Sequence, residues 1–250
     1  MEELLRHKVA IITGAGGALG AGTAHRLAKS GAAVVIADVK GGEAVAADIK
    51  QAGGQALAVT CDVSRKADVE ALIAQAVSTF GGVDILVNNA AIYPSRPWTE
   101  ITEEEWDRVF AVNIKGYYLC ARAAYPHMKA RGGGRIVNIS SITALLGKWD
   151  KLLHYVSTKG AVISFTRALA RELGPEGINV NCIAPGAFPT DAEKIHPDLE
   201  GYNRFVLENQ MIKRRGTADD IAKAVLFLTS SLSDFITGQV VVVDGGWITH

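Results

Sequence analysis

The stretch that decides the fold is Val9–Gly20, with the sequence VAIITGAGGALG. Val9–Ile12 has the composition of a short buried strand, and the glycine-rich turn behind it leads into Ala21–Ser30, which is compatible with a helix. Such a turn lets the backbone come close to a pyrophosphate, which the free N–H groups and the positive dipole end of the helix attract. This stretch therefore predicts a dinucleotide site at the start of an α/β domain.

Short apolar runs recur along the chain between longer helical patterns. They are Val9–Ile12, Val34–Ala37, Ala56–Cys61, Ile85–Val87, Arg135–Ile139, Ile178–Cys182 and Val240–Val243. Several are apolar on both faces, as in strands that are covered on each side. Repeated strand–helix alternation implies parallel pairing through right-handed crossovers. The sequence predicts a single α/β domain over residues 1–250, a Rossmann-type, doubly wound, parallel seven-stranded sheet with helices on both faces.

Local signals refine this prediction at three places. Thr102 and Glu105 have the spacing of a capping box, and Thr217 precedes acidic residues that suit the first turn of a helix. The stretch from Pro185 to about Met211 contains three prolines and lacks periodicity. It follows the sixth strand at its carboxyl end, where ligands bind in open α/β sheets, so we expect residues 186–212 to cover a substrate.

Composition and charge exclude several classes of protein. Lys and Arg together number 26, as do Asp and Glu, so no global charge attracts nucleic acid or an anionic membrane. The charged N-terminal residues do not resemble a signal peptide, so we expect a cytoplasmic protein. Cys61, Cys120 and Cys182 are far apart, which favours reduced thiols. The six histidines have no metal-ligand spacing, and we expect no metal centre.

Asp38 ends the second strand, where a carboxylate can accept hydrogen bonds from both hydroxyls of an adenosine ribose. The same carboxylate would repel a 2′-phosphate. Neither the glycine turn nor Val39 supplies a cation, and Lys40 lies one residue further on. The sequence therefore favours NAD over NADP.

Eight motif elements follow one another at the expected strand ends and helices. They are Thr13-Gly14-xxx-Ala18-x-Gly20, Asp62-Val63, Asn88-Asn89-Ala90-Ala91, Asn113, Ser140-Ser141, Tyr155-xxx-Lys159, Pro185-Gly186-xxx-Thr190, and Gly238-Gln239 with Asp244-Gly245-Gly246. In this order they resemble the short-chain dehydrogenase/reductase family over almost the whole chain. Ala18, Ala91 and Phe188 depart from the commoner family residues, two glycines and a smaller aliphatic residue. The spacing from Ser141 to Tyr155 is slightly longer than is common in the family, which implies an extended loop, Ile142–Trp149, above the substrate.

The resemblance implies a catalytic set of Asn113, Ser141, Tyr155 and Lys159. Tyr155 and Lys159 are four residues apart and share a helix face. A free tyrosine has a pKa of about 10, and we expect the Lys159 ammonium and a cationic nicotinamide to lower it, so that Tyr155 exchanges a proton with the substrate oxygen. By resemblance, Ser141 orients that oxygen, Lys159 also holds the nicotinamide ribose, and Asn113 steadies a water that passes the proton outward. His154 faces another side of the helix and is expected to be structural.

The resemblance also implies an NAD site. Its expected residues are Gly14, Gly17, Ala18, Leu19, Gly20, Asp38, Asp62, Val63, Asn89, Ala90, Ala91, Tyr155, Lys159, Pro185, Gly186, Phe188 and Thr190.

The expected substrate pocket consists of Tyr93, Ser141, Thr143, Trp149 and Phe188. These residues supply apolar surface without an arginine cluster, which suits a small or medium secondary alcohol or its ketone. Within the family, the chain is most similar to the bacterial branch that contains 1-phenylethanol and pyridoxal dehydrogenases. Sugar or polyol oxidation remains open, as does an NADPH-dependent 3-oxoacyl carrier-protein reductase, which Asp38 disfavours. A non-catalytic nucleotide-binding protein is the alternative from another class, but such proteins usually lose the tyrosine or the lysine.

Assembly is expected from the same resemblance. The helical stretch Thr102–Arg131 and the helix from about Leu152 to Leu173 would pair with their symmetry mates. The strand Gln239–Val243 and the helix from Thr217 would form a second interface. Two distinct isologous patches generate a homotetramer.

Overall fold

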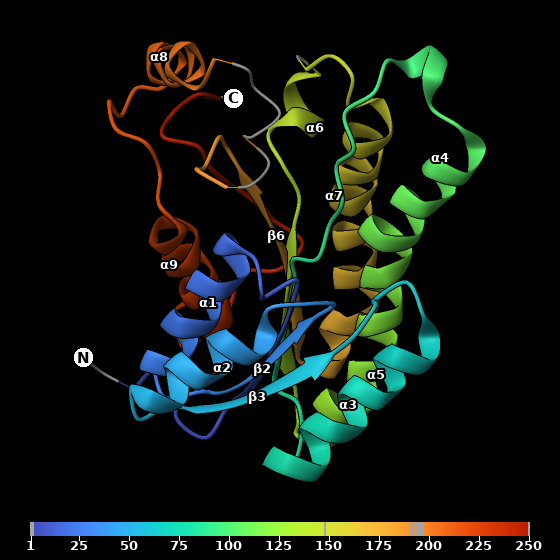
Figure 1. Cartoon of the computed structure of the whole chain (residues 1–250). Helices are drawn as coiled ribbons and strands as arrows, with labels where there is room; N and C mark the ends of the chain where they lie inside the picture. Colours follow the sequence, from blue (N-terminus) through green and yellow to red (C-terminus); the bar gives the residue numbers. More distant parts are fainter. Residues whose placement is uncertain (1–2, 148, 191–192, 194–197, 250) are drawn as a thin grey trace.

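The computed structural model contains one parallel sheet of seven strands in the order β3-β2-β1-β4-β5-β6-β7. The sheet lies between two layers of helices (Figure 1). It describes residues 3–147, 149–190, 193 and 198–249. The strands are β1 (Val9–Thr13), β2 (Ala33–Asp38), β3 (Gln55–Thr60), β4 (Ile85–Asn88), β5 (Gly134–Ile139), β6 (Ile178–Pro185) and β7 (Val240–Val243). All seven coincide with the predicted runs to within a few residues. The predicted Rossmann-type sheet is therefore confirmed.

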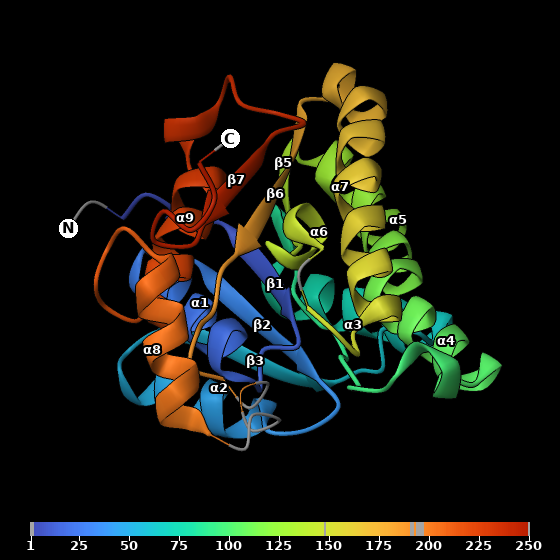
Figure 2. The same cartoon turned by 90° about the horizontal axis from the view of Figure 1, so that it is seen from above.

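Helices cover both faces of the sheet (Figure 2). The α-helices are α1 (Ala18–Lys29), α2 (Gly42–Gln51), α3 (Lys66–Phe80), α4 (Glu103–Phe110), α5 (Gly116–Ala130), α6 (Thr143–Leu146), α7 (Leu153–Leu173), α8 (Leu199–Asn209) and α9 (Ala218–Thr229). Short 3₁₀ turns are η1 (Trp98–Glu100), η3 (Gly174–Glu176) and η5 (Ser231–Ser233), and a π-helical turn, η2 (Ala111–Lys115), joins α4 to α5.

The two faces of the sheet form separate cores. Side chains alternate along a strand, so Ala10 and Ile12 of β1 pack toward α1, α2 and α9, whereas Ile11 packs toward α3, α5 and α7. All three residues are fully buried. Each central strand is thus apolar on both faces, which explains the continuous apolar runs in the sequence.

The helix starts follow their local sequence, with one correction. Thr217 and Asp220 form a complete capping box at α9. At α4 only half of the predicted box is present: Thr102 Oγ1 accepts a hydrogen bond from the Glu105 N–H at 3.2 Å. The Glu105 carboxylate turns instead to Arg96, because a guanidinium is a stronger partner than a backbone amide.

Two segments expected to be loops contain helices. Residues Leu199–Asn209, in the stretch predicted to be irregular, form α8, whose start is capped by Asp198 accepting from the Gly201 N–H at 2.8 Å. The predicted loop Ile142–Trp149 contains one helical turn, α6. Both local starts were missed because neither segment has a long apolar repeat. Residues 148, 191–192 and 194–197, which fall within these segments, lie outside the described residues.

The strand order reverses direction between β1 and β4, and the chain leaves both strands at the same edge of the sheet. In an open α/β sheet this switch point is where ligands bind. Above it, α6, α8 and the start of α7 rise on either side (Figure 1). None of the described helices is long and apolar enough to cross a membrane.

Candidate active site

The ends of β1 and β4 are joined by hydrogen bonds through one asparagine. Asn89 Nδ2 donates to the carbonyl oxygens of Thr13 and Gly14 at 2.9 and 3.0 Å, and the backbone N–H groups of Asn89 and Ala90 donate to Thr13 Oγ1 at 3.0 and 3.2 Å. These bonds fix the start of the glycine turn against β4. The turn then opens into a cavity of about 1350 Å³. This volume exceeds the roughly 300–1,000 Å³ of pockets for drug-sized ligands, as a dinucleotide and a substrate together require.

The glycine turn has space for a close ligand only because it lacks side chains. A Cβ on Gly14 would lie 2.7 Å from Ala90 Cα, and Gly14 has φ +65°, which favours glycine. A Cβ on Gly20 would lie 2.4 Å from Gly14 O. Behind the turn, α1 begins at Ala18 and presents free N–H groups to the cavity. The arrangement fits a dinucleotide pyrophosphate.

Asp38 lies at the edge of this turn. Its Oδ2 accepts from the Gly16 N–H at 2.8 Å, and its Oδ1 accepts from the Lys40 N–H at 3.2 Å. The carboxylate lines the cavity and has further lone pairs for the hydroxyls of a ribose. Lys40 and Val39 line the cavity beside it.

Asp62 and Val63 line the next part of the wall, beyond β3. Asp62 Oδ1 accepts from Ser64 Oγ at 2.6 Å, and Arg108 Nη2 of α4 donates to Asp62 Oδ2 at 2.9 Å. Burial opposes ionisation of Asp62, but the hydrogen bonds from Ser64 and Arg108 outweigh it and lower the pKa of the carboxyl group. Asp62 is therefore a fixed anion, and Arg108, which the sequence analysis did not single out, holds it.

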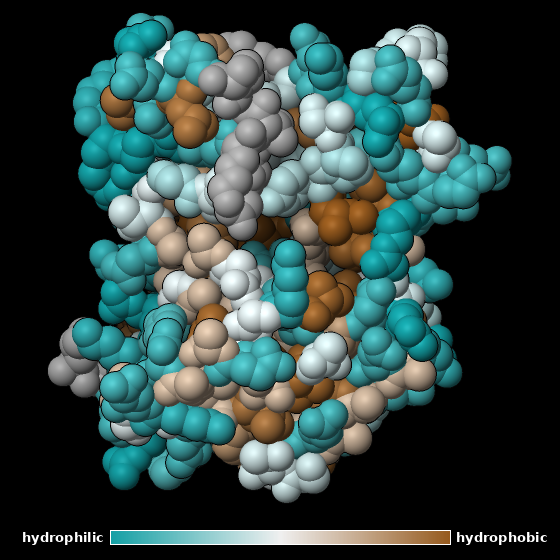
Figure 3. All heavy atoms as spheres, in the orientation of Figure 1, coloured by the Kyte–Doolittle hydropathy of each residue, from teal (hydrophilic) through white to brown (hydrophobic). Residues whose placement is uncertain are grey.

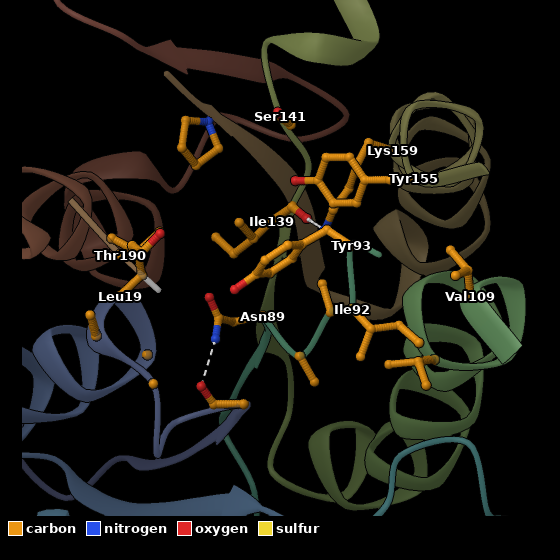
Figure 4. A pocket seen from close by; sticks show the side chains of 18 of the residues that line it. Leu19, Asn89, Ile92, Tyr93, Val109, Ile139, Ser141, Tyr155, Lys159 and Thr190 are labelled. Carbon is orange, nitrogen blue, oxygen red and sulfur yellow. Dashed lines mark hydrogen bonds between the residues drawn. The ribbon is translucent and has the colours of Figure 1, made fainter. Parts of the chain in front are cut away.

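Ser141, Tyr155 and Lys159 meet at the opposite end of the cavity (Figure 4). Ser141 follows β5, and Tyr155 and Lys159 lie on α7. Ser141 Oγ accepts from Thr143 N and Thr143 Oγ1 at 3.2 and 3.0 Å. Ser141 Oγ is the acceptor in both of these hydrogen bonds, so its own proton points away from Thr143. Ser141 also hydrogen-bonds with Tyr155.

The Lys159 ammonium is buried behind Tyr155. Its Nζ donates to Ile139 O at 2.8 Å and to Tyr117 Oη at 3.4 Å, and it lies 5.6 Å from the centre of the Tyr155 ring. Burial lowers the pKa of Lys159 to about 8. Tyr117, which the sequence analysis also did not single out, donates its own hydroxyl proton to Ile139 O at 3.0 Å and places its ring 5.5 Å from the ammonium.

The pKa of Tyr155 differs from the expectation. Burial raises it to about 12 in the protein alone, and the hydrogen bond with Ser141 only partly offsets this. The expected lowering by Lys159 is absent because desolvation of the phenolate dominates. At neutral pH the hydroxyl group of Tyr155 is therefore protonated.

Asn113 is the predicted site residue that lies outside the described cavity lining. It is fully buried in the π-helical turn η2. Its side chain accepts from the Ile92 N–H at 2.8 Å and donates to Ile92 O at 2.8 Å and Thr158 Oγ1 at 3.1 Å. Asn113 thus connects the loop after β4 to α7, a role that its spacing in the sequence did not reveal.

Aromatic residues surround the reacting end of the cavity. Tyr93 and Tyr155 pack edge to face, with ring centres 6.1 Å apart, and both hydroxyl groups point into the cavity (Figure 4). Trp149 stacks obliquely on Trp247 at 5.7 Å, and Phe205 of α8 contacts Trp247 edge-on at 5.5 Å. In the space-filling view, apolar surface gathers in the middle of this face of the molecule (Figure 3).

All other predicted residues line the same cavity. They are Gly14, Gly17, Ala18, Leu19, Gly20, Asp38, Asp62, Val63, Asn89, Ala90, Ala91, Tyr93, Ser141, Thr143, Trp149, Tyr155, Lys159, Pro185, Gly186, Phe188 and Thr190. The structure adds lining residues without a recognisable local pattern, among them Ile92, Glu105, Arg108, Leu152 and Tyr202. Across the described residues, no cluster of three or more His, Cys, Asp or Glu is arranged to hold a metal ion.

Comparisons with known proteins agree with this geometry. A family model described as Enoyl-(Acyl carrier protein) reductase matches residues 14–248. Short-chain reductase protein NovJ of Streptomyces niveus is 40% identical over 248 residues, which cover 96% of this chain and 94% of NovJ. BbsD of Thauera aromatica, a subunit of (2S)-[(R)-hydroxy(phenyl)methyl]succinyl-CoA dehydrogenase, is 40% identical over 245 residues, 97% of each chain.

A crystal structure of a candidate short-chain alcohol dehydrogenase from Sinorhizobium meliloti 1021 has the same fold. It matches with a TM-score of 0.92 at 34% identity and covers 97% of each chain. Together with the sequence relatives, it shows that this chain belongs to the short-chain dehydrogenase/reductase family of oxidoreductases.

The close packing of Gly20 against Gly14 O can be tested by measuring the free energy of unfolding. We expect Gly20→Ala to lower the free energy of unfolding by about 1–3 kcal/mol, because the added methyl group meets backbone atoms that cannot move independently. Gly174→Ala is the control, since its Cβ would meet nothing within 4 Å. Urea unfolding measures both variants. Equal stability of the two variants would show that the turn is not tightly packed.

Proposed function

We propose that this protein is an NAD-dependent dehydrogenase that interconverts a secondary alcohol and its ketone. The observation that carries the proposal is the position of Tyr155, which hydrogen-bonds with Ser141 at one end of a cavity that has Asp38 and the glycine turn at the other. A dinucleotide bound along this cavity would be held by Asp38 and the glycine turn at one end and would bring its nicotinamide to Tyr155 at the other.

Bound in this cavity, the nicotinamide ring supplies the hydride acceptor for oxidation or the hydride donor for reduction. Ser141 holds the substrate oxygen, and Tyr155 Oη takes the hydroxyl proton as the C–H bond breaks, so that the carbon–oxygen double bond forms without a free alkoxide. In the reverse direction Tyr155 donates the proton. Because burial raises the pKa of Tyr155 to about 12 even with Lys159 beside its ring, ionisation of Tyr155 would need the further positive charge that an oxidised nicotinamide would bring.

Asp38 supports NAD over NADP. A carboxylate at this position accepts from ribose hydroxyls and repels a 2′-phosphate. This argues against the NADPH-dependent 3-oxoacyl carrier-protein reductase as the alternative function.

The walls near Tyr155 support a substrate with an aromatic or alicyclic group. Tyr93, Trp149 and Phe188 supply flat apolar surface, and Tyr202 of α8 adds another ring. The name of the relative BbsD describes a substrate with a hydroxy(phenyl)methyl group, a benzylic secondary alcohol of the kind such walls would hold. The part of the 186–212 segment that forms α8 would cover this end of the cavity.

An absorbance assay for NADH over a panel of aryl, alicyclic and sugar alcohols tests the function. We expect turnover with 1-phenylethanol-like alcohols, little with sugars, and a kcat about 10²–10⁴ lower for Tyr155→Phe, which removes the proton acceptor. Binding of NAD to Tyr155→Phe, measured by calorimetry, should stay near native. Native-like activity of Tyr155→Phe would contradict the mechanism. Faster turnover of polyols than of aryl alcohols would show that the proposed substrate class is wrong.

Cofactor preference gives a separate prediction. Val39 is 59% exposed and lines the cavity beside Asp38, so an arginine there has room to meet a phosphate. We expect Asp38→Ser with Val39→Arg to shift the ratio of kcat/KM for NADP over NAD by more than about tenfold, since one repulsion is lost and one charge pair is gained. Val39→Arg alone is the control, because it keeps the repulsive carboxylate. An unchanged ratio in the double variant would place adenosine recognition elsewhere.

We also propose the homotetramer expected from the family. Tyr118 of α5 is 45% exposed and Phe227 of α9 is 38% exposed, so each of the two expected interfaces includes a helix with an exposed aromatic side chain. Light scattering should give a mass near four times 26.5 kDa. A mass of one or two subunits in a fully active sample would contradict this assembly.

A further inference from the structure

The helix that carries Tyr155 begins without an ordinary cap. Leu152 is at the N-cap position of α7, and within the described chain this N-terminus has neither a side-chain cap from that position nor an acidic residue in its first turn. The first N–H groups of a helix have no partner inside it. The N–H of Tyr155 is one of them, yet it donates to His154 Nδ1 at 3.0 Å. The preceding side chain therefore replaces the missing cap.

The hydrogen bonds of His154 select one tautomer of its ring. Its Nδ1 accepts a hydrogen bond and so carries no proton. Its Nε2 lies 3.2 Å from Glu105 Oε1, and since an ionised carboxylate only accepts, Nε2 carries the proton and donates it. The imidazole is 0% exposed, so water does not compete for either nitrogen. One neutral tautomer satisfies both contacts.

Besides His154, Arg96 and Thr102 also hold Glu105. Arg96 Nε donates to both carboxylate oxygens at 3.0 Å, and the Glu105 N–H is bound by Thr102. The Arg96 N–H donates to Lys151 O at 2.8 Å, just before α7. The start of α4, the loop after β4 and the start of α7 are thereby tied together at His154.

We propose that His154 is a positioning residue for the reaction: its Nδ1 fixes the first turn of α7, and with it the direction of Tyr155, while Glu105 fixes its tautomer. The proposal rests on the function proposed above for Tyr155. A proton transfer depends steeply on the position of its acceptor, and a displacement of about 1 Å can cost about 10² in rate. His154 is fully buried and is not among the residues that line the cavity, so its effect would act through Tyr155.

Two variants separate the two hydrogen bonds. The amide oxygen of His154→Asn occupies the place of Nδ1 and can accept from the Tyr155 N–H, whereas the amide nitrogen of His154→Gln occupies the place of Nε2 and can donate to Glu105. We expect His154→Asn to keep kcat within about threefold of native and His154→Gln to lower kcat by about tenfold to a hundredfold. KM for NAD should be unchanged in both. If the two variants lower kcat equally, or neither lowers it, the proposal is wrong.

The role of Glu105 has a matched control on the same helical turn. Glu105→Ala removes the acceptor that fixes the tautomer of His154 and should lower kcat. Glu103 is exposed and does not line the cavity, so Glu103→Ala should leave kcat unchanged. Equal kcat values for these two variants would overturn the role of Glu105.

Hydrogen exchange of the Tyr155 amide gives a readout that does not depend on turnover. In protein without substrate, we expect protection in the native chain and in His154→Asn, and faster exchange in His154→Gln. Equal exchange in all three overturns the inference even if the enzyme is active. If the native chain oxidises no alcohol on the panel, the proposed function is wrong instead. The exchange rates then still test the hydrogen bond from the Tyr155 N–H to His154 Nδ1.

Discussion

The close approach of the backbone at the ends of β1 and β4 is the constraint on which the site depends. Gly14 lies so near Ala90, and Gly20 so near Gly14, that neither position has room for a Cβ. Asn89 holds this junction by donating to Thr13 O and Gly14 O. The absence of side chains at these positions creates both the tight packing of α1 against the sheet and the open surface for a pyrophosphate. Packing and binding thus share one cause.

A second constraint is the buried charge of Lys159. An ammonium group loses much of its hydration when it is buried, and within the described chain it forms no ion pair. Ile139 O and the hydroxyl and ring of Tyr117 partly replace the lost water. This incomplete compensation lowers the pKa of Lys159 to about 8, yet the group is still mainly charged at neutral pH. The positive charge is therefore retained beside Tyr155, where a phenolate would need it.

The reacting end of the cavity is assembled from many elements, in contrast to the cofactor end. Tyr93 follows β4, Ser141 follows β5, and Tyr155 lies on α7. Asn113 and His154 connect these pieces from behind: Asn113 joins Ile92 to Thr158, and His154 joins Glu105 to the Tyr155 amide. Such buried, fully paired polar groups can fix relative orientations that apolar packing alone would leave looser.

The sequence by itself determined the sheet, the glycine turn, Asp38 and the Tyr155–Lys159 pair. Each of these is recorded in a short motif of neighbouring residues or in the repeated alternation of strand and helix patterns along the chain. The helix α8 was missed because its segment has no long apolar repeat, although Asp198 caps its start. The capping box at Thr102 was misjudged because Arg96 competes for the Glu105 carboxylate. Only the tertiary structure decided that Asn113 lies behind the cavity, that Tyr117 contacts Lys159, and that burial raises the pKa of Tyr155. The first two contacts join residues 21 and 42 positions apart in the sequence, and no local pattern records which residues meet or how much water Tyr155 loses on folding.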